Sequence, residues 1–452
     1  MSDDQLAPGA EPFDGNLYEQ AAAPAMTEDA LLAAIADGSL TPEAPTAPDG
    51  EPDTRWKDAA REILSSTPLM AVGAVLLAFL VGSLMIVFTG GSITEAYTAL
   101  IRGSLWNSNL DNPIVPLTRT LRFATPMIAA GLGIAVTFKA GLFNIGGRGQ
   151  MIFGAIGAGW LGFGLRDAGL PSFLHLIIVI IGGMLAGALW GALAGLLKAK
   201  TGAHEVIVTI MLNFVAYSFL QYLLAAPGAW PLQGAMRDPA QAIPLTPNIP
   251  DSARLPRLFL ETNWGFVIAL LLVAMCWWLL YRSTTGFAFR AVGENPRAAR
   301  VAGISVARST IVAFAVSGAL IGFAGVHQVL DPGRSGGFAD TIDGGIGFDA
   351  ITVALLGASH PVGVLFAGIL FGAFRSGGVT MQSEAGVPAE IATIIQILIV
   401  MFIAAPPLVR AIFRLPQPSV LAKAKKAEAK AAKQAAKAAL ITEDATNEEV
   451  AP

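Results

Sequence analysis

Apolar runs separated by short polar stretches follow one another along most of the chain. A run of about 18 or more apolar residues is long enough for an α-helix to cross the hydrocarbon core of a bilayer. The pattern predicts an all-α, polytopic membrane protein with about ten transmembrane helices, at residues 69–88, 121–138, 150–165, 173–197, 205–225, 265–281, 306–329, 346–358, 362–375 and 389–409. The third and eighth segments are short, and either could be a re-entrant or broken helix.

The polar stretches between these helices predict the topology. Residues 90–118 and 227–263 are interpreted as external, the first as a loop or an interfacial segment. With a cytoplasmic N-terminus, the basic loops all lie inside, in agreement with the positive-inside rule. These loops contain Lys139 and Arg148, Lys198 and Lys200, Arg282 to Arg308, and the C-terminal lysines. We therefore expect a multi-pass protein of the plasma (inner) membrane, with both termini in the cytoplasm.

A short internal similarity predicts how the two halves are related. Residues 186–193 resemble residues 367–374, and Glu205-Val206 parallels Glu390-Ile391. Because five helices per half is an odd number, the halves would have opposite orientations, forming an inverted 5+5 repeat with the solute pathway between them. The matching residues are common ones, so coincidence is the alternative.

Composition supports the membrane assignment and argues against several chemistries. The chain of 452 residues is 54% hydrophobic and 14% charged, with one cysteine and four histidines in separate segments. A cysteine or histidine metal site is therefore not expected. No P-loop pattern occurs, and the G-x-G-x-x-G at 157–162 lies inside a predicted span with no strand before it. We expect no cofactor and no catalytic residue in this chain.

The two ends of the chain differ from its apolar centre. Residues 1–60 form an acidic, Ala/Pro-rich leader that we expect to be disordered and cytoplasmic, with one short helix at 27–38. Residues 416–452 form a Lys/Ala-rich cytoplasmic tail, helical or disordered, with weak attraction to anionic lipid. The transmembrane domain is then residues 61–415.

Small residues at four-residue spacing predict how the helices pack. Gly183, Gly187, Gly191 and Gly195 lie on one helix face, and Gly318/Gly322 and Gly368/Gly372 repeat the spacing. Such a face lets another helix backbone approach closely. The pattern indicates a packed bundle and carries no functional information.

An Arg-rich segment, residues 282–308, interrupts the apolar pattern in the middle of the chain. Asn295 suits a helix N-cap, Pro296 the first helical position and Gly303 the stop. The short helix between them is either a solvated connector or a docking surface for a partner protein.

Polar residues near predicted helix ends are candidates for a solute pathway. In 143–150, glycines and polar residues lie between apolar segments and can break a helix, although an ordinary cytoplasmic turn is the alternative. Glu205, Thr209 and Asn213 share one helix face; Glu205 is near enough to the cytoplasm to be solvated, whereas Asn213 should face the bundle interior. Further polar candidates are Gln221, His327, Gln328, Asp349 and Gln396.

Four stretches together resemble a known family: FNIGGRGQ (143–150), GAHEVIVTIMLNF (202–214), RAVGENPRAARVAGI (290–304) and GFDAITVALLGASHPVGVLFAG (347–368). They are similar to permease subunits of ABC importers in the branch for nucleosides and simple sugars, related to branched-chain amino acid permeases. The resemblance implies about ten helices, a second permease that forms a hetero-pair with this chain, a cytoplasmic ABC ATPase that holds ATP and Mg, and an extracytoplasmic substrate-binding protein. It implies no nucleic acid among the partners.

The resemblance also assigns site residues. It implies that the coupling segment (residues 282–308) docks on the ATPase through Arg290, Gly293, Glu294, Asn295, Pro296, Arg297, Ala298, Ala299, Arg300 and Gly303. Val301 and Ile304 would add apolar contacts. The expected substrate pathway comprises Phe143, Asn144, Gly146, Gly147, Gln150, Glu205, Thr209, Asn213, Phe348 and Asp349. One departure is Arg148, because relatives usually carry an acidic residue there.

The hypothesis is an ABC importer permease for a nucleoside or related small polar solute, working by ATP-driven alternating access. A simple-sugar or branched-chain amino acid permease is the alternative within this class. A secondary transporter or channel is an alternative from another class, but it would need a charged relay deep in its helices. Here the deep positions are mostly Asn, Gln, Thr and Gly. An integral membrane enzyme is a more distant alternative, because the sequence offers no convergent set of His, Asp, Glu and Ser side chains.

Overall fold

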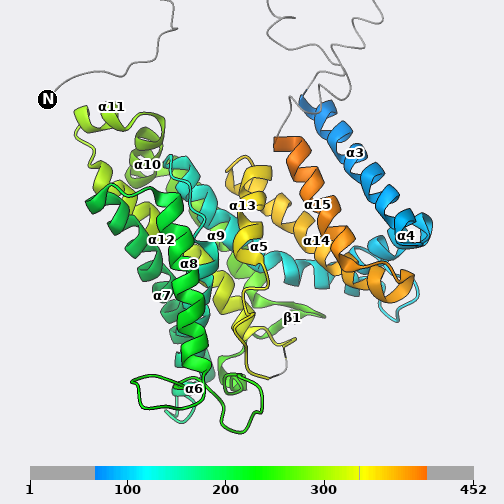
Figure 1. Cartoon of the computed structure of the whole chain (residues 1–452), viewed down its shortest axis with the longest axis horizontal. Helices are drawn as coiled ribbons and strands as arrows, with labels where there is room; N and C mark the ends of the chain where they lie inside the picture. The colour runs from blue at the N-terminus through cyan, green and yellow to red at the C-terminus, as the bar shows by residue number, and fades with distance from the viewer. Residues whose placement is uncertain (1–66, 335, 405–452) are drawn as a thin grey trace, which may run out of the picture. The chain divides into compact units, whose positions relative to one another are not determined.

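The computed structural model describes residues 67–334 and 336–404 (Figure 1). Its helices are α3 (Thr67–Phe88), α4 (Ile93–Ser104), α5 (Val115–Lys139), α6 (Gly147–Gly164), α7 (Ser172–Thr201), α8 (Glu205–Leu224), α9 (Trp264–Arg282), α10 (Thr284–Glu294), α11 (Pro296–Val301), α12 (Val306–Leu330), α13 (Ile346–Leu356), α14 (Pro361–Ala385) and α15 (Ala389–Ala404). Between α8 and α9 lie the short 3-10 helix η2 (Asp251–Ala253) and an antiparallel pair of strands, β1 (Arg257–Phe259) and β2 (Thr262–Asn263).

Each of the ten predicted segments coincides with a helix, but fewer qualify as full spans. Within the described residues, α5, α7, α8, α9, α12 and α14 are long and apolar enough to cross a membrane. A seventh span results if α3 and α4, bent by 118° at their break, count as one. Helices α13 and α15 are shorter, and α6 is absent from the helices that meet the length and hydropathy test. The helical membrane architecture is confirmed, whereas the count of ten stays a prediction.

Several boundaries differ from the hydropathy pattern. Helix α4 lies within 90–118, α5 begins at Val115 instead of residue 121, and α14 continues to Ala385. The extension of α14 carries polar residues that pack on protein: the buried Ser376 hydroxyl donates to the Gly103 carbonyl on α4 at 2.6 Å. Hydropathy cannot reveal such a partner. The acidic leader with its predicted helix, the end of the tenth segment and the tail lie outside the described residues.

Helices α5 and α12 form the centre of the bundle. Their most apolar stretches are 78% and 72% buried, against 22% for α7. The outer helices instead leave large apolar side chains exposed, among them Leu80 on α3, Leu189 on α7 and Leu271 on α9. A surface of this kind is stable only where lipid or another protein covers it.

The predicted glycine packing is confirmed between α7 and α12. A Cβ atom added to Gly187 or Gly191 would collide with the backbone of α12, and one added to Gly318 would collide with α7. The same arrangement recurs between α14 and α5, where Gly368 and Gly372 face the backbone of α5. Both helix pairs therefore pack through glycines at four-residue spacing.

Candidate coupling segment and solute pathway

The coupling segment begins directly after α9 and consists of two short helices. Ser283 ends α9 and caps α10, because its hydroxyl accepts a hydrogen bond from the Gly286 amide at 3.0 Å. Helix α10 was not predicted from the sequence. The second helix, α11, is the one predicted from the sequence, and it is confirmed. The Asn295 side chain accepts hydrogen bonds from the amides of Arg297 and Ala298, each at 3.0 Å. Pro296 starts this helix.

The outward face of α11 is basic, with one apolar residue. Arg297 and Arg300 are exposed, and neither pairs with a carboxylate within the described part of the chain. Val301 is 91% exposed, while Ala299 is the buried residue of this helix. Gly303 ends the turn with φ of 81°, a conformation that glycine adopts without strain. Exposed cations around an exposed valine form a surface suited to a protein partner.

The inner face of α10 is bound firmly to the bundle. Phe289 is fully buried in the main core. Arg290 does not point outward, since its guanidinium lies 5.5 Å from the centre of the Tyr281 ring. Gly293 contacts the backbone of Lys139 and Gly141, where α5 ends. The coupling segment therefore touches the loop that leads into α6.

The loop before α6 is held by buried side-chain amides. Asn144 donates to Gln150 at 3.2 Å and to Ser317 on α12 at 3.0 Å, and its oxygen accepts from the Gly146 amide at 2.8 Å. The predicted residues Asn144, Gly146 and Gln150 thus come together, but their polar atoms fix the backbone.

Helix α8 fixes the same loop from the other side. The Asn213 oxygen accepts from the Gly149 amide at 2.8 Å, and its nitrogen donates to the Ile145 carbonyl at 2.9 Å. The Thr209 hydroxyl accepts from the Ile145 amide at 3.3 Å. The expectation that Asn213 faces the interior is confirmed, because only 4% of it is exposed. Glu205 lies apart and pairs with Lys198 at 2.6 Å.

Helices α6 and α13 meet at their N-terminal ends. A Cβ atom on Gly147 would collide with the Gly347 carbonyl, so the two backbones are in direct contact. We call residues 143–150 and 345–349 the junction. Within the junction, Phe143 and Phe348 are exposed and Asp349 is half-buried. Two helix N-termini that meet inside a bundle present backbone amides to the same space.

Arg148, the departure from the family motif, has partners that the sequence did not reveal. Its Nε lies 3.3 Å from Asp343, and its guanidinium lies 4.6 Å from the centre of the Tyr217 ring on α8. The Tyr217 hydroxyl donates to Asp340 at 2.9 Å, and Gln221 donates to the same carboxylate oxygen at 3.1 Å. We call Arg148, Tyr217, Gln221, Asp340 and Asp343 the polar cluster.

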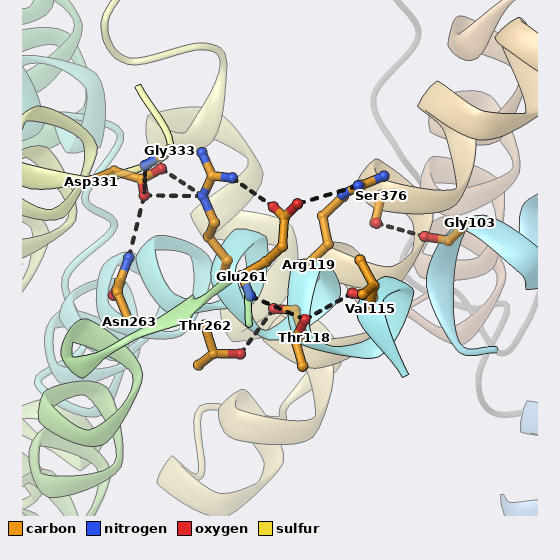
Figure 2. A network of polar contacts seen from close by, with 11 residues as sticks. Gly103, Val115, Thr118, Arg119, Glu261, Thr262, Asn263, Asp331, Gly333 and Ser376 are labelled. Atoms are coloured by element: carbon orange, nitrogen blue, oxygen red, sulfur yellow. Dashed lines mark hydrogen bonds and ion pairs between the residues drawn. The ribbon is translucent and has the colours of Figure 1, made fainter. Parts of the chain in front are cut away.

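A second charged network lies where α5 begins and α12 ends, at the end of these helices away from the coupling segment (Figure 2). Arg122 pairs with Asp331 at 2.8 Å and with Glu261 at 3.0 Å, and Arg119 also approaches Glu261. Asn263 donates to Asp331 at 3.3 Å. This charge clasp (Arg119, Arg122, Glu261, Asn263 and Asp331) joins α5, α9, α12 and the strand pair. Its members are far apart in sequence, so no local pattern could have found it.

A bundle of apolar helices with a polar junction inside it and a basic, capped helix at one end is the architecture of a membrane transport subunit. The chain belongs to the family described as branched-chain amino acid transport system / permease component, whose profile matches residues 117–404. It is therefore a permease of the ABC transporter type, as the resemblance implied.

The comparisons also identify individual relatives. The chain is 35% identical to the guanosine ABC transporter permease protein NupP of Bacillus subtilis, over 74% of this chain and 92% of that protein. It is 32% identical to the glucose ABC transporter permease protein TsgB13 of Haloferax volcanii, over 75% and 86%. It is also 32% identical to the nucleoside ABC transporter permease protein NupB of Lactococcus lactis, over 74% and 90%.

Proposed function

We propose that this permease imports a nucleoside or a related small polar solute. The observation that carries the proposal is its similarity, over nearly their whole length, to permeases named for guanosine and for nucleosides. A sugar is the second candidate, because the chain is about equally similar to a permease named for glucose.

The coupling segment is proposed to dock on a cytoplasmic ABC ATPase, which binds ATP and Mg and hydrolyses the ATP. Exposed Arg297, Arg300 and Val301 supply the contact surface. The segment lies between α9 and α12 and touches the loop before α6 through Gly293. Movement of the ATPase would thus be transmitted through the coupling segment to α9, to α12 and to the junction.

The topology proposed from the sequence has ten spans in an inverted repeat, with both termini in the cytoplasm. Two features of the fold support the repeat. Glycines at matching positions pack α7 on α12 and α14 on α5. The third and eighth segments, α6 and α13, also meet at their N-terminal ends, as half-helices do at the centre of inverted-repeat transporters.

The other proposed partners are a second permease, in a hetero-pair, and an extracytoplasmic substrate-binding protein. Helix α8 exposes Gln221 close to Tyr217 and the charged residues of the polar cluster. Polar groups on a membrane helix avoid lipid, so a protein or water must cover this face. A second permease placed here would enclose the pathway between the two chains.

Uptake of labelled guanosine and glucose by cells that carry the complete transporter tests the function. We expect guanosine uptake that stops when the P-loop lysine of the partner ATPase is replaced by alanine, because the phosphates then lose their cation. Saturable uptake of glucose but not guanosine would favour the sugar candidate. Uptake that persists with the inactive ATPase would instead indicate a secondary transporter.

A further inference from the structure

The polar cluster lies beside the second half of α8. Helix α8 has 20 residues and is therefore about 30 Å long, which places Asn213 about 12 Å and Tyr217 about 18 Å from its start. Asn213 holds the N-terminal end of α6, so Arg148 lies at a similar depth. A charged side chain at the centre of a bilayer is costly unless it faces protein or a water-filled cavity.

Part of the cluster remains available to a ligand. Arg148 uses only Nε in its bond to Asp343, and its two terminal nitrogens make no hydrogen bond within the described residues. Asp340 uses only Oδ2, so Oδ1 is likewise free within that part of the chain. The side chain of Arg148 is 29% exposed. A forked donor and a carboxylate acceptor are therefore both held by Tyr217, Arg148 over its ring and Asp340 at its hydroxyl.

This set of groups is complementary to one kind of nucleobase. An arginine fork binds the O6 and N7 acceptors of a 6-oxopurine, whereas adenine places an amino donor where O6 would be. A carboxylate accepts hydrogen bonds from the N1–H and amino group of guanine, which lie on the neighbouring edge. A pyrimidine lacks the N7 acceptor altogether.

We propose that Arg148 and Asp340 form a half-site in the pathway that selects 6-oxopurine nucleosides, such as guanosine and inosine, over adenosine and pyrimidine nucleosides. Asp343 is a positioning residue that holds Arg148 over Tyr217. The proposal rests on the proposed nucleoside import and names its substrate class.

The test compares initial uptake of labelled guanosine, adenosine and uridine in cells whose only copy of this permease is wild type, Arg148→Gln or Asp340→Asn. The substrate-binding protein is unchanged, so any altered ratio between solutes comes from the permease. Arg166→Gln is the matched control, since Arg166 lies just beyond the other end of α6 and bonds only to the Asn248 carbonyl among the described residues. Assembly is checked by co-purification of the ATPase.

We expect Arg148→Gln and Asp340→Asn each to lower the uptake efficiency for guanosine by about tenfold or more, with adenosine and uridine changed less than about threefold. Equal losses for all three solutes in an assembled complex would show a structural role and overturn the proposal. If Arg148→Gln fails to assemble, Arg148→Lys keeps the charge but not the fork, and an unchanged guanosine-to-adenosine ratio would then refute the half-site. A wild-type transporter that imports no nucleoside would refute the proposed function itself.

Discussion

Two asparagines hold helix N-termini in this permease, and they do so in opposite ways. Asn295 caps α11 in the coupling segment from the position directly before the helix, and it is exposed. Asn213 accepts a hydrogen bond from the first turn of α6 at the junction, but it belongs to α8, 64 positions along the chain, and it is buried. The first contact is local and is visible in the sequence. The second depends on the tertiary fold.

The difference extends to the two regions as a whole. In the coupling segment, Arg297, Arg300 and Val301 are exposed, and the two arginines pair with no carboxylate within the described chain. The junction is an inward structure whose loop is held by the buried side-chain amides of Asn144, Gln150 and Asn213, so it depends on exact geometry. Substitutions in the first region should disrupt assembly, and those in the second should disrupt stability and transport.

The largest expected effect comes from reversing charge on the coupling segment. The double substitution Arg297→Glu and Arg300→Glu turns the exposed face of α11 from basic to acidic. We expect loss of ATPase co-purification and at least a tenfold loss of uptake: a basic face suits an acidic partner surface, and reversing its charge would turn this attraction into a like-charge repulsion of several kcal/mol. Arg257→Glu, on β1 away from this segment, is the control for co-purification. Normal assembly of the double variant would refute the docking surface.

The next effect tests the contact between α6 and α13. Gly147→Ala places a methyl group against the Gly347 backbone, and such overpacking typically costs about 1–3 kcal/mol. We expect a lower melting temperature in detergent and reduced uptake, while the ATPase still co-purifies. Gly164→Ala is the matched control on the same helix, since its methyl group would meet only Trp160 at an ordinary distance of 3.9 Å. Equal behaviour of both variants would contradict the close approach.

Removing the buried Asn213 side chain should have the next effect, on the stability of the complex. Asn213→Ala leaves the Gly149 amide and the Ile145 carbonyl without this partner, at a cost of about 1–3 kcal/mol for a buried polar group. Thermal unfolding of the purified complex measures the loss. A stability equal to that of wild type would show that water replaces the amide, and therefore that the junction is open to water.

The smallest effect should come from the exposed cap. Asn295→Ala removes two side-chain hydrogen bonds from α11, and such caps contribute about 1 kcal/mol. We expect ATPase affinity to fall only a few-fold, with no change in the unfolding of the membrane helices. If this variant destabilised the complex as much as Asn213→Ala, the contrast between local and tertiary capping would not hold.

Local and periodic signals made most of the fold predictable. Hydropathy located ten segments that each coincide with a helix within the described residues, and the spacing of Gly187 and Gly191 identified the face that packs on α12. What local patterns missed were polar contacts between distant segments. Ser376 and Arg122 reduce the hydropathy of helix ends that are in fact packed against protein. The third and eighth segments were rightly singled out as unusual, although only the structure shows that they meet.

In the candidate site, too, features with local signals could be predicted, whereas those that depend on distant segments could not. The cap at Asn295 and the stop at Gly303 could be predicted because both signals lie within the segment itself. Arg148 was noticed as a departure from the family motif, but its role could not be read without Asp343 and Tyr217, which come from other parts of the chain. The predicted pathway residues Asn144 and Asn213 proved to hold the loop in place.

The charge clasp holds α9 and α12 together at the end away from the coupling segment. Helices α9 and α12 each run from the clasp, at Asn263 and Asp331, to the coupling segment at their other end. Under the proposed docking on an ATPase, the clasp would be the fixed end of these two helices, and the coupling segment would be the end that moves. Helix α12 has 25 residues and is about 37 Å long, so a tilt of only about 5° around the clasp would move its driven end by about 3 Å. In the proposed mechanism, the ion pairs of Arg122 with Asp331 and Glu261 would limit how far this movement separates α5 from α12 at the other end.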